Sequence, residues 1–231
     1  MRYIYIVLIK AHTGLGSVAR KFTRYPYTHI AVCLDKSLTD YISFSRRYHY
    51  YPFEAGFTHE YRDYYAFGEH RDYGVKVFRL PVEEDAYADI LTFIKDRENG
   101  GYLFNVYSMA TMPLIGGFRI AGAENCMSFT SQIIEKSRAV KLAKPYWRYS
   151  IRDIDELLIK FQYFTGRIRK RPCDFHPEYM QKFCIKRYLN GMVRLMIPLT
   201  KQLITRAKMN VGHIVRANKR KNNIHDQAHI F

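Results

Sequence analysis

An uninterrupted apolar run begins at the third residue of the chain, and it constrains the fold more than any other sequence feature. Residues 2–9 read RYIYIVLI, a β-branched run that is typical of a buried strand. Residues 28–34 (THIAVCL) and 40–46 (DYISFSR) have the same character on either side of a short polar segment, which predicts a hairpin. Residues 75–80 (VKVFRL) predict a further strand, so we expect an antiparallel sheet.

Helical patterns are found between and after these strands. Residues 83–97 carry apolar side chains at helical spacing and are followed by Asn-Gly-Gly, a typical helix end. Residues 126–137 again predict a helix, and Ser150 with Asp153 resembles a capping box for another. The apolar segment 103–118 is interrupted by a proline and paired glycines, so it predicts a buried core helix and a turn rather than a membrane span.

Basic charge is concentrated in the last third of the chain. Residues 161–231 hold 15 Lys and Arg against three acidic residues, and they account for +12 of the net charge of +16. The earlier residues are nearly balanced, and the 48% hydrophobic composition suits one medium domain with an appendage. We therefore predict a domain over residues 1–164 and a basic, mostly helical extension over residues 165–231. Within the domain, residues 46–73 are rich in Tyr, His and Arg and predict a long covering loop, in which short strand pieces could occur.

The basic extension allows three uses. Apolar residues recur between positions 185 and 204 with bases among them, and Pro198 is expected to break or kink any helix there. Such a helix could pack on the domain, bind an anionic membrane surface or attract nucleic acid, and the last of these is the least favoured. The polar stretch 216–231 predicts a flexible end.

The four cysteines and the N-terminal residues indicate a cytosol-like compartment. The opening MRYIYIVLIKAHTG lacks the features of a secretory signal, so reduced thiols and a cytoplasmic location are expected, peripheral at a membrane if the extension binds one. Cys173, His176 and Cys184 lie close in sequence, but their spacing does not resemble that of a zinc site. We expect neither a metal nor a cofactor.

Two residues suggest nucleophilic chemistry. Cys126 lies where the helix 126–137 is predicted to begin, and a helix N-terminus favours the thiolate form that acts as a nucleophile. His29 begins an otherwise apolar strand, a position from which an imidazole can face a helix. Each residue alone is more typical of a buried structural side chain. Their order in the chain and their flanking residues make a catalytic role more plausible for the two together than for either alone.

Four segments carry a resemblance to a known superfamily: THIAVCLD, YISFSRR, YPFEAGF and, some 90 residues after the first of them, ENCMSFTSQII. Together they resemble the circularly permuted branch of the papain-like NlpC/P60 superfamily, which includes YiiX-like hydrolases and lecithin:retinol acyltransferase-like enzymes. The most specific match is the N-C-x-x-F pattern at Asn125, Cys126 and Phe129. The resemblance covers residues 1 to about 160 and implies an α+β fold in which His29 precedes Cys126, the reverse of the order in papain.

The residue that orients His29 is the least determined member of the site. Relatives carry a polar residue on the strand after the histidine, and a hairpin centred on Ser37 places Ser45 opposite His29, or Ser43 after a shift of two residues. Neither is the His, Glu, Asn or Gln that relatives usually carry. A bare dyad, or an acid from the following segment such as Glu54 or Glu60, therefore stays open.

These observations predict a cysteine hydrolase that acts through an acyl-thioester on Cys126, with His29 as the base. The resemblance implies an amide substrate in a peptide or peptidoglycan fragment. Two alternatives stay open: a lipid-directed thioesterase, amidase or acyltransferase, and an inactive scaffold that binds membrane or nucleic acid through its basic extension.

Overall fold

The apolar run near the N-terminus forms a central strand of a six-stranded sheet. The computed structural model describes residues 1–12, 20–21 and 23–205. Adjacent strands are all antiparallel, in the order β4-β3-β2-β1-β5-β8. No side chain from Ile4 to Ile9 is more than 5% exposed, which confirms the predicted buried strand. The strands are β1 (Arg2–Lys10), β2 (His29–Cys33), β3 (Tyr41–Arg46), β4 (Ala55–Glu60), β5 (Asp72–Val82) and β8 (Gln162–Arg169).

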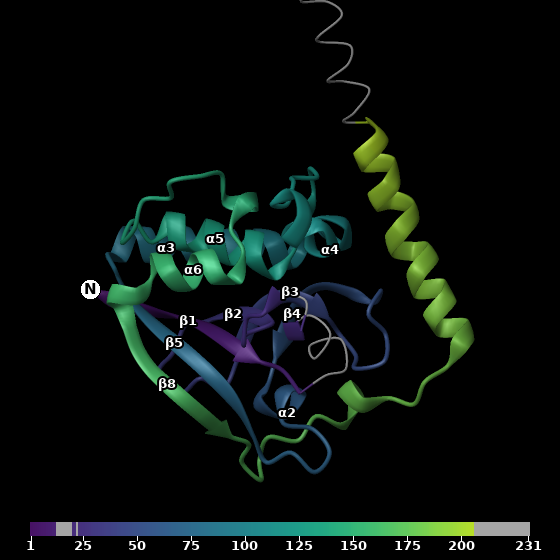
Figure 1. The fold of residues 1–231 in the computed structure, drawn as a ribbon, viewed down its shortest axis with the longest axis horizontal. Helices are drawn as coiled ribbons and strands as arrows, with labels where there is room; N and C mark the ends of the chain where they lie inside the picture. The colour runs from purple at the N-terminus through teal and green to yellow at the C-terminus, as the bar shows by residue number, and fades with distance from the viewer. Residues whose placement is uncertain (13–19, 22, 206–231) are drawn as a thin grey trace, which may run out of the picture.

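Each face of the sheet packs against its own apolar cluster. Successive strand side chains point to opposite faces, so Ile4, Ile6 and Leu8 join the cluster beneath α3, α5 and α6, whereas Tyr5 and Val7 join a second cluster with α2 (Figure 1). The chain therefore has an α+β fold. The helices are α2 (Arg62–Tyr65), α3 (Glu84–Asn99), α4 (Val106–Ile115), α5 (Cys126–Lys136), α6 (Ile151–Leu157) and a helix over residues 185–205, and β6 (Leu103–Phe104) pairs with β7 (Ala123–Glu124).

The helices predicted from capping and periodicity are confirmed. The helix α5 begins at Cys126, where the side chain of Asn125 accepts a hydrogen bond from the N–H of Ser128 and the Ser128 hydroxyl accepts one from the N–H of Asn125. Ser150 and Asp153 form the same reciprocal arrangement at the start of α6. The hairpin is also confirmed, because β2 and β3 pair in the register that opposes Val32 and Ile42.

The segment predicted as a covering loop instead contains β4 and α2. The buried positions of β4 are Gly56, Thr58 and Glu60, whereas the alternate positions, such as Phe57, are half-buried. An alternating strand is recognised in sequence by apolar residues on its buried side. Here that side is small and polar, so the sequence indicated no more than short strand pieces within a loop.

The predicted boundary after residue 164 falls inside β8. Residues on both sides of it pair with β5, for example Phe164 with Val77 and Thr165 with Lys76. The strand β8 is an exposed edge strand, and its RIRKR sequence therefore resembled a solvated charge run.

Pro198 does not break the C-terminal helix, since residues 185–205 stay helical through it. Proline cannot donate the helical hydrogen bond to the carbonyl four residues earlier, which here is that of Arg194. Arg194 is an exposed residue, so the loss of this hydrogen bond is tolerated. The helix packs on the domain through Gly191, Leu195 and Leu199. The stretch 216–231 lies outside the described residues.

The apolar segment 103–118 forms α4, but this helix is not fully buried as expected. Met112 is buried, whereas Leu114 and Ile115 at its end are largely exposed. Within the described ranges, we find no helix with both the length and the apolar character needed to cross a membrane.

Candidate active site

Cys126 is the first residue of α5, and its position is fixed by the cap that precedes it. The reciprocal hydrogen bonds of Asn125 and Ser128 hold the first turn, and the Cys126 side chain is 5% exposed. The first N–H groups of a helix have no acceptor within the helix, and their dipoles favour negative charge nearby. The thiol therefore lies where a thiolate, and an oxyanion formed beside it, would be stabilised.

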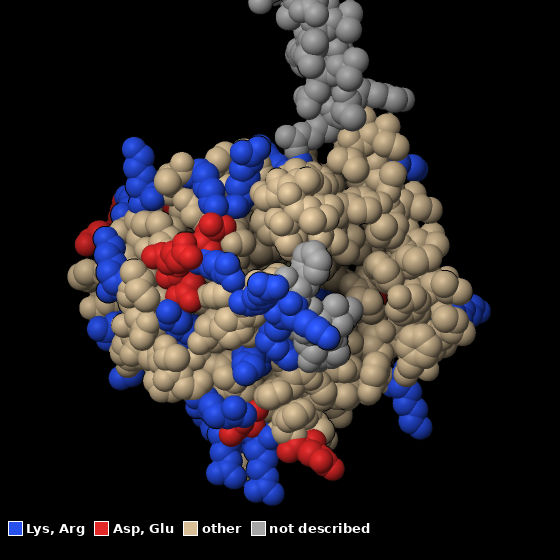
Figure 2. Space-filling model, viewed as in Figure 1, with Lys and Arg blue, Asp and Glu red and all other residues tan. Residues whose placement is uncertain are grey.

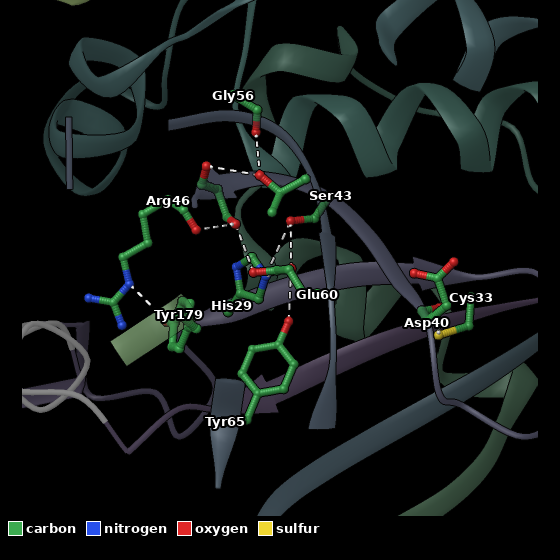
Figure 3. Close-up of polar contacts among 11 residues, drawn as sticks. His29, Cys33, Asp40, Ser43, Arg46, Gly56, Glu60, Tyr65 and Tyr179 are labelled. Atoms are coloured by element: carbon green, nitrogen blue, oxygen red, sulfur yellow. Dashed lines mark hydrogen bonds and ion pairs between the residues drawn. The ribbon is translucent and has the colours of Figure 1, made fainter. Parts of the chain in front are cut away.

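His29 is held at the start of β2 by a buried carboxylate. Its Nε2 lies 2.8 Å from Oε2 of Glu60 and 3.3 Å from Oγ of Ser43 (Figure 3). Both contacts use the same ring nitrogen, which leaves Nδ1 for a further partner. The helix α5, which begins at Cys126, packs against β2, which begins at His29, and the sulfur of Cys126 contributes to raising the pKa of His29.

Glu60 at the end of β4 is the centre of a polar network inside the protein. The hydroxyl groups of Ser43 and Tyr65 donate to its Oε2 at 2.8 Å each, and the hydroxyl of Ser45 donates to its Oε1 at 2.7 Å. Burial alone raises the pKa of a carboxyl group, but the charge of His29 and these donors outweigh burial and lower the pKa of Glu60. Glu60 therefore stays ionised although it is only 5% exposed.

The charge state of His29 follows from its two neighbours. Burial lowers the pKa of an imidazole, but the carboxylate of Glu60 and the sulfur of Cys126 outweigh burial and raise the pKa of His29 to about 10. His29 is therefore an imidazolium at neutral pH, and the carboxylate of Glu60 holds it. An imidazole oriented by a buried acid is one part of a site for thiol nucleophilic chemistry.

The site residues predicted from sequence lie close together, but their contacts differ from the simplest expectation. The β2–β3 register is the one that opposes Ser45 to His29, yet Ser43 contacts the ring and Ser45 contacts only the carboxylate. Glu54 and Glu60 were the two acids that the sequence offered as partners of His29, and Glu60 is the one that contacts it. Glu54 instead pairs with Arg187 through two contacts of 2.6 and 2.7 Å.

Tyr65 was not predicted from sequence. It belongs to the short helix α2, which follows β4, and its ring lies 5.9 Å from that of His29 between centroids. Only the return of the chain after Glu60 brings this hydroxyl to the carboxylate. The available signal was its position five residues after an acidic strand end, and that pattern is too common to indicate a site.

The described residues offer no metal centre. Nowhere in the ranges that the structure describes do three or more His, Cys, Asp or Glu side chains gather in a way that could hold an ion. His176 instead pairs with Asp63 at 3.0 Å, and Cys173 and Cys184 are exposed free thiols.

The fold and the cluster define an α+β protein with a buried cysteine–histidine–glutamate site. Comparison of the chain with protein-family models, curated proteins and solved structures finds no match.

Proposed function

We propose that this protein is a cysteine-dependent hydrolase that cleaves an amide bond through an acyl-thioester on Cys126, with His29 as the base. One observation carries the proposal: the imidazole of His29 is held by the buried carboxylate of Glu60 at 2.8 Å through Nε2, on the strand against which α5 packs with Cys126 as its first residue. Thiol acyl transfer requires a thiol, an imidazole that takes the proton of the thiol, and an acid that orients the imidazole.

The mechanism follows from these positions. His29 holds the proton of Cys126, and the thiolate attacks the carbonyl carbon of the substrate. The N–H of Cys126 stabilises the oxyanion of the tetrahedral intermediate. His29 then donates its proton to the leaving amine, and the C–N bond breaks to give a thioester. In the second half, His29 accepts a proton from water, which displaces the thiolate and releases the carboxylic acid.

Glu60 acts as a positioning residue in this mechanism. It fixes the ring with Nδ1 towards Cys126, and its charge stabilises the imidazolium that forms when the thiol gives up its proton. Ser43, Ser45 and Tyr65 hold the carboxylate in turn. The hydroxyls are therefore proposed to orient the acid, rather than to replace it as the third member of the site.

The order of the site residues agrees with the permuted papain-like resemblance. His29 lies on a strand and precedes Cys126 on a helix, and the sheet is antiparallel throughout. A peptide or peptidoglycan-type amide is accordingly the first substrate class to test.

A lipid-directed thioesterase, amidase or acyltransferase is the second candidate. It is favoured by the exposed Leu114 and Ile115 at the end of α4, because a surface that meets acyl chains would carry such residues. Incubation with peptide amides and with acyl-chain amides and esters, followed by mass spectrometry of the products, distinguishes the two classes.

Selective alkylation tests the site without a known substrate. Cys126 is buried, whereas Cys173 and Cys184 are exposed, so accessibility alone would make Cys126 the slower to react. We expect iodoacetamide at pH 6.5 to label Cys126 first, as located by mass spectrometry of peptides. The preference should disappear in His29→Ala and persist in the matched variant His59→Ala, whose ring pairs with Asp40.

Two results would contradict the proposal. The first is labelling of Cys126 no faster than that of the exposed thiols, which would indicate an inactive scaffold. Alternatively, Cys126→Ala could hydrolyse a substrate as well as the unaltered protein does, which would place the chemistry elsewhere.

A further inference from the structure

The helix over residues 185–205 has one apolar face against the domain. Gly191, Leu195 and Leu199 recur at every fourth position and are buried. Leu199 shares an apolar cluster with Ala123, three residues before Cys126. This packing fixes the helix beside the segment that leads into the candidate site.

A second apolar stripe on the same helix has no partner among the described residues. Five large side chains are each between 46% and 59% exposed. With 3.6 residues per turn, they lie on the side opposite the buried stripe. Apolar surface of this kind marks an interaction site when it is contiguous. The stripe consists of Ile185, Leu189, Val193, Ile197 and Ile204.

The helix α4 adds exposed apolar residues on the same flank of the molecule. It is tied to the C-terminal helix by a hydrogen bond of 2.7 Å between the hydroxyls of Tyr107 and Thr200, and the two helices are neighbours in Figure 1. Leu114 and Ile115 at its end are 75% and 62% exposed. We call the stripe together with Leu114 and Ile115 the apolar flank.

Charge near the apolar flank is of one sign. Residues 185–205 contain four bases and no Asp or Glu, and residues 103–118 contain no charged residue. One of the bases, Arg187, is paired with Glu54. Figure 2 shows the flank of these helices as mostly uncharged surface with separate basic side chains around it. A partner that fits must therefore combine an apolar interior with negative charge.

We propose that the apolar flank docks onto an anionic lipid bilayer, with the 185–205 helix lying in the plane of the interface. Apolar residues on one side of a helix, flanked by Lys and Arg, are what binding at a bilayer surface requires. A second copy of the chain fits less well. A symmetric contact would bring Lys186, Arg194 and Lys201 of each copy together, with no acid on either helix to pair with them.

Docking would also orient the candidate site. Because Leu199 packs beside Ala123, the start of α5 follows the helix wherever it binds. Because the buried stripe that contacts Ala123 lies opposite the apolar flank, the helix would lie between the start of α5 and the bilayer. The inference does not depend on the hydrolase proposal, because it rests on surface composition alone.

Cosedimentation with vesicles tests the docking surface. The probes are vesicles of phosphatidylcholine with phosphatidylglycerol, compared with phosphatidylcholine alone, and the full chain is used. We expect the double variant Val193→Asp and Ile197→Asp to bind anionic vesicles at least about tenfold more weakly. The control, Ile159→Asp with Phe175→Asp, changes apolar residues elsewhere that are more exposed than Val193 and Ile197, and it should bind within about twofold of the unaltered chain.

A charge variant provides a second, independent arm. Replacing Arg194 and Lys201 by Gln should weaken binding to anionic vesicles by about fivefold for each base removed. Equal binding by the Asp double variant and the unaltered chain would overturn the proposal, as would absence of binding at physiological salt. A dimer that the Asp variant dissociates, without vesicle binding, would also overturn it and would assign the flank to self-association.

Discussion

Substituting Glu60 by Gln tests the electrostatic reasoning about the site most directly. The amide keeps the size of the side chain but removes the negative charge that faces Nε2 of His29 at 2.8 Å. Glu60 is the first of the groups that raise the pKa of His29 against the effect of burial. Without it, burial lowers the pKa of the imidazole with only Cys126 to oppose it.

The expected change is large. The pKa of His29 is about 10, against an ordinary value of 6.5. We expect a fall of at least about two pKa units, which corresponds to roughly 2.7 kcal/mol of differential stabilisation. At pH 9 the imidazolium fraction should then fall from about nine-tenths to below about one-tenth.

Nuclear magnetic resonance titration of the His29 ring measures this pKa. The matched control is Glu54→Gln, which removes an acid of the same segment that pairs with Arg187 instead. The control should leave the pKa of His29 within about half a unit of its original value. An unchanged pKa in Glu60→Gln would refute the assignment of Glu60 as the acid that holds the imidazolium.

The same pair makes a pH-dependent contribution to stability. The pKa of His29 is raised, so its stabilisation is complete below pH 6.5 and is lost as the pH rises towards 10. The pKa of Glu60 is lowered, so its stabilisation is present above about pH 4.5 and is lost at more acidic pH. The free energy of unfolding should therefore differ most between the unaltered chain and Glu60→Gln from about pH 4.5 to 6.5, as measured by urea denaturation.

Three further outcomes follow from the packing. Ser43→Ala should slow the alkylation of Cys126 more than Ser45→Ala does, because only Ser43 contacts both His29 and the carboxylate of Glu60. Each variant should lose about 1.5–3 kcal/mol of unfolding free energy. Equal labelling rates in the two variants would contradict the distinction between the two serines. Leu199→Ala should lower the free energy of unfolding by about 2–5 kcal/mol because Leu199 is fully buried, whereas Leu189→Ala, at an exposed position, should lower it by less than about 0.5 kcal/mol. Chemical denaturation measures both values, and the opposite ranking would contradict the packing of this helix. Deleting residues 165–231 should lower the melting temperature measured by circular dichroism, since it removes most of β8, and an unchanged melting temperature would show that the sheet does not need this strand.

Local features could be read from the sequence because their causes are local. The apolar run at the N-terminus can only be a buried element, and its β-branched residues favour a strand. Asn125 and Ser128 determine where α5 begins, and this places Cys126 at the helix N-terminus whatever surrounds it. The short segment between β2 and β3 likewise determined the register that opposes Ser45 to His29.

The identity of the acid was decided only by the tertiary structure. Glu54 and Glu60 lie in one segment and have the same chemistry, so no local pattern separates them. The pairing of β4 with β3, which opposes Thr58 to Ser43, carries Glu60 to the ring, while Arg187, 133 residues along the chain, holds Glu54. The sequence by itself therefore determined the thiol at the helix start and the imidazole on the strand. Long-range strand pairing decided which carboxylate pairs with that imidazole and raises its pKa, because a buried ion pair requires partners that only the folded chain brings together.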